Sequence, residues 1–166
     1  MSRVRYNFTI VTGDMCLIRL SDVKGRLVAF AVVDAEDHQL VRRFRWRRTG
    51  TGYVVGRPGD VRLSRVVMRD VPGGMEVDHI DGDLLDNRKG KLRVCTHRQN
   101  GYNQRSRRLG YKGIIWDRGK WKAYIGIGGG ACRHLGRFDS PKEAARAYNS
   151  AARAAFGPFA KLNEVE

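Results

Sequence analysis

Residues 76–103 contain side chains whose types and spacing suit the hydrolysis of a phosphodiester bond. Such hydrolysis needs a base that activates water and a cation that stabilises the leaving oxygen. His79 titrates near neutral pH and can act as the base, while Asp78 offers a hard oxygen ligand for a divalent ion. Adjacent residues at a strand end diverge. Asp78 and His79 could therefore serve opposite sides of one phosphate.

Two amides extend this candidate site. Asn87, in the polar turn between two short predicted strands, can hydrogen-bond the His79 ring and fix its tautomer. An amide oxygen from the following helix, which Thr96 would cap, can supply a second metal ligand. A stretch rich in Asp, Asn and Gly can be polar merely because it is a turn. The whole spacing, ending in Asn100, favours the functional interpretation.

Residues 1–75 precede this motif and read as short strands and two short helices. Alternating and apolar runs predict the strands, and apolar positions at i, i+3 and i+4 predict the second helix. An acidic first turn suits the dipole of the first helix. The predicted elements are a hairpin from residues 15–20 and 27–33, a helix capped by Asp34 with Glu36 and Asp37 in its first turn, a hairpin from 44–47 and 53–55, and a helix at 62–68.

Residues 110–166 predict a three-stranded sheet followed by one helix. The strands are expected at 111–117, 120–127 and 131–138, with a tight turn at Arg118. Ser140, Pro141 and Glu143 together signal a helix start, and Gly157 signals its end. The face formed by Ala144, Ala147 or Tyr148, Ala151 and Ala155 is small enough for the helix to lie close on the sheet. In the middle strand, alternation directs Lys122 and Tyr124 to one face and residues 121, 123 and 125 to the other.

The chain is strongly basic and apolar enough to fold. Its 166 residues include 32 Lys and Arg against 17 Asp and Glu, and 42% are hydrophobic, which excludes a wholly disordered basic tail. The formal charge is +7 over residues 1–75, zero over 76–103 and +8 over 104–166. Two basic flanks around a carboxylate-rich centre suit a protein that grips phosphates and holds a metal ion.

A dense arginine cluster lies in the first flank. Arg43, Arg45, Arg47 and Arg48 alternate with two aromatic residues, which favours phosphate contact with base stacking over a strand with a solvated face. The longest apolar run, residues 27–33, is too short to cross a bilayer, and no apolar stretch follows the first residues. We therefore expect no membrane partner and a cytoplasmic location, which would be the host cytoplasm or nucleoid if a bacteriophage encodes the protein.

The central motif resembles HNH endonucleases of the ββα-metal fold, and in particular the His-Asn-Asn homing endonucleases of bacteriophages. The resemblance rests on residues 77–83, 85–88, 92–94 and 99–100. It implies that Asp78 binds the metal, His79 is the general base, Asn87 orients that base and Asn100 is the second ligand, with Asn103 and His97 as weaker substitutes. It also implies one Mg²⁺-type ion, with Mn²⁺ possible, and products with 5′-phosphate and 3′-hydroxyl ends. Relatives often have His where this chain has Ser64, and they usually read Glu-Asn-Leu-Arg where this chain has residues 90–93, so that Lys91 falls on the Asn.

The C-terminal segment resembles the Apetala/ethylene-response-factor DNA-binding domain over residues 110–163. The matching stretches are 111–114, 120–125, 135–138, 141–148 and 156–163. The resemblance implies a three-stranded antiparallel sheet that lies in the major groove, with a helix behind it. The residues expected to face DNA are Lys112, Arg118, Lys122, Tyr124, His134 and Arg137.

Together these patterns predict an α+β protein: a ββα-metal HNH nuclease core with a β-rich N-terminal region, followed by a three-stranded antiparallel sheet plus one helix. The expected divisions are a basic region at 1–75, the nuclease motif at 76–103, a basic linker at 104–109 and the DNA-binding domain at 110–166. We expect a monomer or weak dimer that cleaves or nicks double-stranded DNA and uses no small-molecule cofactor. The alternatives are a DNA-binding regulator with a degenerate nuclease motif and an RNA- or ribosome-associated protein.

Overall fold

The computed structural model describes residues 7–22, 24, 26–104 and 110–165. The chain forms two compact units, Met1–Cys95 and Thr96–Glu166. Each unit has its own hydrophobic cluster. Most of the predicted linker, residues 105–109, lies outside the described part of the chain, as do residues 23 and 25 of the first predicted hairpin.

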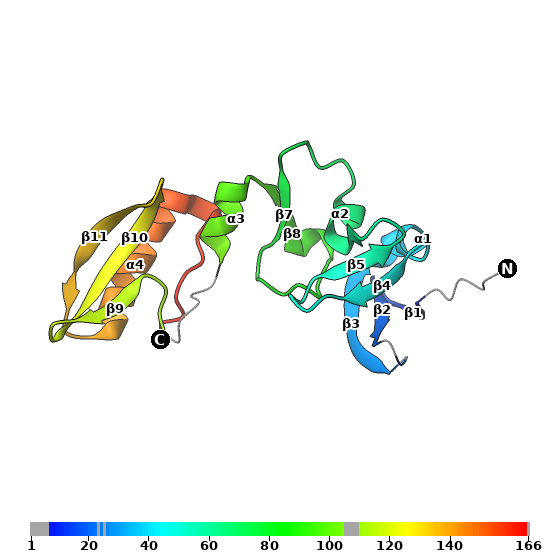
Figure 1. Ribbon diagram of the computed structural model, residues 1–166, viewed down its shortest axis with the longest axis horizontal. Coiled ribbons are helices and arrows are strands. Elements are labelled where there is room, and N and C mark those ends of the chain that lie inside the picture. The colour runs from blue at the N-terminus through cyan, green and yellow to red at the C-terminus, as the bar shows by residue number, and fades with distance from the viewer. Residues whose placement is uncertain (1–6, 23, 25, 105–109, 166) are drawn as a thin grey trace. The chain divides into compact units, whose positions relative to one another are not determined.

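The N-terminal unit contains three small antiparallel sheets among its described residues, with the orders β1-β2-β3, β4-β5-β6 and β7-β8 (Figure 1). Both predicted hairpins are present, as β2-β3 and β4-β5. Its elements are β1 (Thr9–Thr12), β2 (Met15–Ser21), β3 (Leu27–Asp34), η1 (Ala35–Asp37), α1 (His38–Val41), β4 (Arg45–Arg48), β5 (Val54–Arg57), β6 (Val61–Arg62), α2 (Leu63–Met68), β7 (Glu76–His79), η2 (Lys89–Lys91) and β8 (Leu92–Cys95).

One face of each of the three sheets packs into the hydrophobic core of this unit. Alternation along β2 buries every second side chain, as expected for a strand with one solvated face. Trp46 is buried and packs against Gly56 on the neighbouring strand, where a Cβ atom would come within 2.6 Å of the indole ring. The buried residues of its hydrophobic cluster are Cys16, Ile18, Leu20, Ala31, Val33, Val41, Trp46, Val54, Leu63, Val67, Val77 and Leu92.

The predicted helix after β3 is present as η1 and α1, but the predicted cap is wrong. The Asp34 side chain makes no hydrogen bond that caps the first turn of this helix. Its carboxylate instead accepts a hydrogen bond from the backbone N–H of Lys89, 2.8 Å away. A partner 55 residues further along the chain therefore replaces the local one.

The C-terminal unit contains a three-stranded antiparallel sheet in the order β9-β10-β11, with the helix α4 across one face (Figure 1). The helix starts as predicted, because the Ser140 Oγ accepts the N–H groups of Lys142 and Glu143 and Pro141 occupies the first turn. The elements are α3 (His97–Asn103), β9 (Ile114–Asp117), β10 (Lys120–Gly128), β11 (Ala131–Phe138), α4 (Pro141–Phe156) and η3 (Gly157–Phe159).

The face of α4 that packs on the sheet differs slightly from the predicted one. Ala144 and Tyr148 are buried as expected, but Ala155 is exposed and Ala152 is buried in its place. The contact stripe drifts by one position over the helix, because about 3.6 residues complete a turn. The cluster beneath α4 is centred on Ile125, Tyr148 and Ala152.

The helix α3 packs within the C-terminal unit. Its Tyr102 ring stacks on Phe156 with centroids 3.9 Å apart, and the Arg98 Nη2 donates to the carbonyl of Ile127 at 2.6 Å. Thr96 caps the helix as predicted, in a reciprocal capping box with Gln99.

The order β7, β8, α3 along the chain agrees with a ββα arrangement. The ββα core itself stays a prediction, because its strands and its helix belong to different units.

Candidate functional site

The end of β7 brings the two candidate catalytic side chains of the N-terminal unit together. The His79 Nε2 lies 3.1 Å from the Asn87 Oδ1, and both side chains are buried. The Asn87 Nδ2 donates to the carbonyl of Leu84 at 3.2 Å, which orients the amide so that its oxygen faces the ring. An amide oxygen only accepts. The His79 Nε2 must therefore carry the ring hydrogen, which makes Nδ1 the nitrogen that can take up a proton.

Burial shapes the protonation of His79. Desolvation of the ring lowers the pKa of His79 below its ordinary value of 6.5, because an imidazolium is poorly solvated there. The hydrogen bond to Asn87 and the nearby Asp78 carboxylate act in the opposite direction and offset part of this effect. The ring is therefore mostly neutral at neutral pH, as a general base must be.

The neighbouring Asp78 is held by a cross-strand ion pair. Asp78 on β7 lies opposite Arg93 on β8, and the Asp78 Oδ2 accepts from the Arg93 Nη2 at 2.7 Å and from Nε at 2.9 Å. Both side chains are largely buried. A guanidinium fork fixes a carboxylate in one orientation. Asp78 and His79 leave opposite faces of the β7-β8 ribbon, as the alternation of side chains in a strand requires.

The donor set fits a hard divalent cation rather than a metal that needs many protein ligands. Asp78 provides a fixed carboxylate, and Mg²⁺ is commonly held by one or two carboxylates with water and phosphate oxygens. Among the described residues, no group of three or more His, Cys, Asp and Glu side chains is placed to hold a metal ion. The other predicted ligand, Asn100, and its substitutes His97 and Asn103 lie in α3 and so in the other unit.

The predicted arginine cluster divides between two faces of the β4-β5-β6 sheet. Arg45 and Arg47 share the outer face, whereas Arg48 follows Trp46 on the opposite face and Arg43 lies in the turn before β4. All four are exposed. Alternation along β4 explains the division, since side chains two apart share a face.

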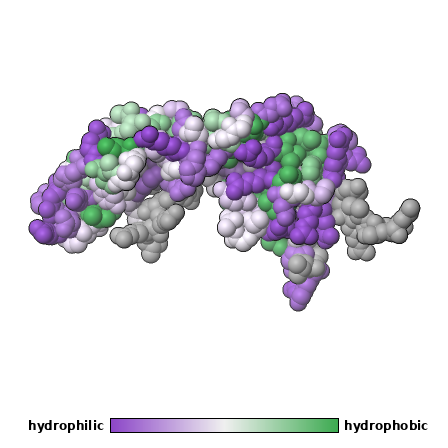
Figure 2. Space-filling model, turned by 45° about the horizontal axis from the view of Figure 1, so that its top comes forward, coloured by the Kyte–Doolittle hydropathy of each residue, from purple (hydrophilic) through white to green (hydrophobic). Residues whose placement is uncertain are grey.

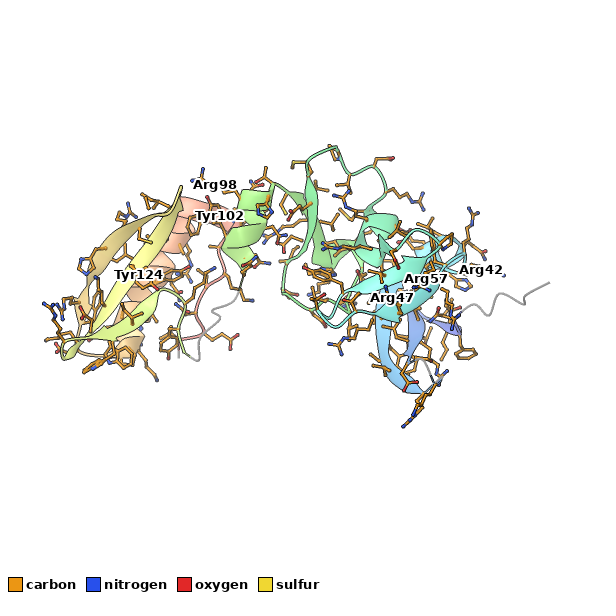
Figure 3. The ribbon with its side chains drawn as sticks, in the orientation of Figure 1. Arg42, Arg47, Arg57, Arg98, Tyr102 and Tyr124 are labelled. Carbon is orange, nitrogen blue, oxygen red and sulfur yellow. The ribbon has the colours of Figure 1, made fainter. Side chains whose placement is uncertain are left out.

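The structure adds two arginines that the sequence analysis missed. Arg57 pairs with Arg45 across β4 and β5, and Arg62 on β6 lies opposite Val55 on the same outer face. The Arg62 guanidinium lies 4.2 Å from the centroid of the Tyr53 ring. Figure 3 shows Arg47 and Arg57 close together on this sheet. The register of the predicted hairpin would have revealed Arg57, because it places that residue opposite Arg45.

One acidic residue lies between the arginines of the outer face. The Asp60 Oδ1 is 3.2 Å from the Arg47 Nη2 and 3.8 Å from the Arg57 Nε. We name the set Arg45, Arg47, Arg57 and Arg62 the arginine face. Its four positive charges outnumber this single carboxylate, which leaves a local basic surface on an exposed sheet.

In the C-terminal unit, four of the six predicted DNA-facing residues share one face of the sheet. Lys122 pairs with Arg137, and Tyr124 pairs with His134, on the face opposite the buried Ala123 and Ile125. Figure 3 shows Tyr124 on β10. The fifth residue, Arg118, is exposed in the β9-β10 turn at a φ of 47°.

The sixth residue, Lys112, turns inward within the C-terminal unit. Its Nζ donates to the carbonyls of Tyr102 and Gln104, each at 2.7 Å. Desolvation by burial, with the charge of Lys161, lowers the pKa of Lys112 to about 8. Because its ammonium is partly buried against these two carbonyls, Lys112 is not among the proposed DNA contacts.

Comparison with known proteins relates the candidate site to a family. A family model described as HNH endonuclease matches residues 69–102, which include Asp78, His79, Asn87 and Asn100. This match supports a nuclease, a hydrolase that acts on DNA.

Two relatives extend this comparison. An uncharacterized HNH endonuclease of Acanthamoeba polyphaga mimivirus is 28% identical over 168 residues, which cover 96% of this chain and 87% of that protein. An ethylene-responsive transcription factor of Arabidopsis thaliana is 54% identical over 48 residues, which cover 28% of this chain and 19% of that protein. No solved structure matches the chain.

The surface is hydrophilic over most of the face seen in Figure 2. No helix among the described residues is long and apolar enough to span a membrane. Of the nine exposed large apolar side chains among the described residues, five lie on β1 and β3 and Phe8 lies just before β1, while Ile80, Trp116 and Ile127 lie elsewhere.

Proposed function

We propose that this protein is a metal-dependent DNA endonuclease of the homing type, which hydrolyses phosphodiester bonds of duplex DNA. The observation that carries the proposal is the hydrogen bond between His79 and Asn87. The preceding residue on β7, Asp78, has its carboxylate fixed by Arg93, and all three residues fall within the segment that matches the HNH endonuclease model.

In this proposal His79 acts through Nδ1. The Nε2–H group donates to Asn87, so Nδ1 takes a proton from the attacking water as its oxygen bonds to phosphorus. The bond from phosphorus to the 3′ oxygen then breaks, and the leaving oxygen takes up a proton from solvent. The products carry a 5′-phosphate and a 3′-hydroxyl group.

Asp78 is the proposed metal ligand of the N-terminal unit, and Asn100 as second ligand remains a prediction from the sequence. A bound Mg²⁺ or Mn²⁺ ion supplies charge stabilisation at the leaving oxygen. The protein's part is to hold the Asp78 carboxylate in one orientation, which Arg93 does from the neighbouring strand.

Two surfaces are proposed to bind DNA. The exposed arginine face of the N-terminal unit suits phosphate contacts, which carry affinity without sequence preference. The outer face of the β9-β10-β11 sheet, with Lys122, Tyr124, His134 and Arg137, suits the major groove. The second relative is a transcription factor by name, which supports DNA binding by the C-terminal unit.

The decisive experiment is a supercoiled-plasmid assay with Mg²⁺ or Mn²⁺, with EDTA, and with His79→Ala. We expect metal-dependent conversion to open-circle or linear DNA, lost in His79→Ala while DNA affinity stays nearly unchanged. His38→Ala is the matched control, because His38 is another histidine of this unit and its Nε2 lies 3.0 Å from the Thr9 Oγ1. Intact plasmid across a range of salt and DNA substrates would contradict the proposal.

A DNA-binding regulator is the second candidate function. The Arg93 guanidinium already neutralises Asp78, and Lys91, where this chain departs from the pattern of the family that the motif resembles, pairs with Asp81 at 2.7 Å. Tight binding to a defined site without conversion of any plasmid or genomic DNA would favour this candidate.

A further inference from the structure

The strand β3 holds the loop that carries Asn87. The Val32 N–H donates to the carbonyl of Leu85 at 2.8 Å, and the Asn87 N–H donates to the carbonyl of Val32 at 2.7 Å. These bonds form a parallel bridge between Val32 and Asp86. The loop is thereby attached to the first sheet on the N-terminal side of Asn87.

Asp34 makes the attachment on the other side. Its Oδ2 accepts the backbone N–H of Lys89 at 2.8 Å. The Lys89 side chain reaches the same acidic segment, where its Nζ lies 3.0 Å from the Asp37 Oδ2 and also contacts Glu36. The Asp37 side chain is almost completely buried. Residues on both sides of Asn87 are therefore fixed to one segment, residues 32–37.

These attachments to residues 32–37 restrain the position of the Asn87 side-chain amide. Successive Cα atoms are about 3.8 Å apart, so a shift of the backbone at Lys89 is transmitted within two residues to Asn87. The amide must remain within about 3 Å of the imidazole nitrogen to hold the tautomer. Asp86 does not supply this restraint, because its carboxylate is engaged by Arg88 inside the loop.

We propose that Asp34 is a positioning residue that holds Asn87 against His79 and thereby fixes the His79 tautomer. The inference rests on the proposed function for its catalytic consequence, although the positioning itself is a property of the folded unit. Asp34 lies outside residues 69–102, which match the endonuclease family model. Residues that precede the motif in the chain thus help to fix the tautomer of His79, the proposed base.

The first readout is the tautomer, measured without added metal by nitrogen NMR of the histidine rings in ¹⁵N-labelled full-length protein. The His79 signals are assigned by their loss in His79→Ala, since the chain has only 4 histidines. The wild-type ring should be in the Nε2–H form. Asp34→Ala should mix the two tautomers and speed hydrogen exchange at the Asn87 amide, whereas Asp34→Asn should keep both near wild type, because Asn retains an acceptor oxygen.

The second readout is the plasmid cleavage rate at saturating DNA. Asp34→Ala should lower it by about tenfold, as expected for a displaced catalytic group, while DNA affinity stays unchanged. Asp22→Ala is the matched control, because the Asp22 Oδ1 likewise accepts backbone N–H groups, at 2.8 and 2.9 Å, in a turn away from the loop. If Asp34→Ala unfolds, Asp34→Glu replaces it, since it keeps the charge and displaces the acceptor by one methylene.

The two readouts separate the inference from the proposed function. An unchanged tautomer and unchanged Asn87 exchange in Asp34→Ala and Asp34→Glu would overturn the positioning role, whatever the cleavage rate does. An inactive wild-type protein whose His79 tautomer still responds to Asp34→Ala would overturn the endonuclease and support the positioning role. An equal response in Asp22→Ala would also overturn the inference, because it would show a general loss of stability.

Discussion

Each unit contains a buried asparagine side chain that makes several hydrogen bonds, and the two differ in what they hold. In the C-terminal unit, Asn149 on α4 accepts the Asn163 N–H at 2.8 Å and donates to the Asn163 carbonyl at 2.9 Å. In the N-terminal unit, Asn87 faces the ring of His79. One amide closes a backbone segment against a helix. The other controls an ionisable side chain, which is the arrangement expected where chemistry occurs.

The largest expected effect separates these two asparagines by activity. Asn87→Ala removes the partner that selects the His79 tautomer, so we expect the cleavage rate to fall by about 100-fold with DNA affinity retained. Asn149→Ala should leave the rate within about twofold of wild type. Single-turnover plasmid cleavage measures both. Equal losses in the two variants would mean that Asn87 is structural.

Stability should show the reverse order. Asn149→Ala leaves the backbone groups of Asn163 without their partners, which we expect to cost about 1–3 kcal/mol in the C-terminal unit. Native-state hydrogen exchange at the β10 amides of the full-length protein measures this cost. Because two units need not unfold together, exchange at β2 amides serves as the internal control and should not change.

The arginine face offers a comparison with another charged surface of the same unit. Arg45, Arg47 and Arg57 are exposed on β4 and β5. Replacing all three by Gln should reduce the slope of log affinity against log salt by about 0.9 for each phosphate that is no longer neutralised. A double replacement of Lys24 and Arg26 by Gln, in the β2-β3 turn, is the control and should leave the slope unchanged. Equal changes in both sets would indicate a diffuse charge effect.

The smallest expected effect is a shift in pH dependence. Burial lowers the pKa of His79 below 6.5, and the base works only when neutral. Cleavage should therefore be retained as the pH falls to 6.5 and be lost at lower pH. Asn87→Ala removes a hydrogen bond that raises the pKa of His79, so the midpoint of its residual activity should move further down. A wild-type midpoint above 6.5 would contradict this assignment.

The C-terminal unit was the more predictable of the two because its signals are local. The Ser140 cap, Pro141 and the alternation around Ala123 each concern a few consecutive residues, and each is present in the structure. The shared face of Lys122, Tyr124, His134 and Arg137 follows from the same alternation. Lys112 could not be placed in this way, because its carbonyl partners, on α3 and just after it, lie 8–10 residues away.

The residues of the candidate nuclease site could be predicted from the sequence, but the hydrogen bonds that hold the Asn87 loop in place could not. The types and spacing of Asp78, His79 and Asn87 were sufficient to predict the contact between the last two, and it is present at 3.1 Å. The interactions of Asp34 with Lys89 and of Val32 with Asn87 span 55 residues each. No local pattern encodes such contacts, which depend on how separate sheets pack.

The ion pair of Asp78 and Arg93 has a consequence for the stability of the folded protein in the absence of a divalent ion. A carboxylate that already has a cationic neighbour needs no divalent ion to be tolerated in the folded unit. This differs from small zinc domains, in which the metal supplies the folding free energy. If the protein is the metal-dependent endonuclease proposed here, removal of divalent ions should stop cleavage without unfolding the protein, and cleavage should return when the ion is added back.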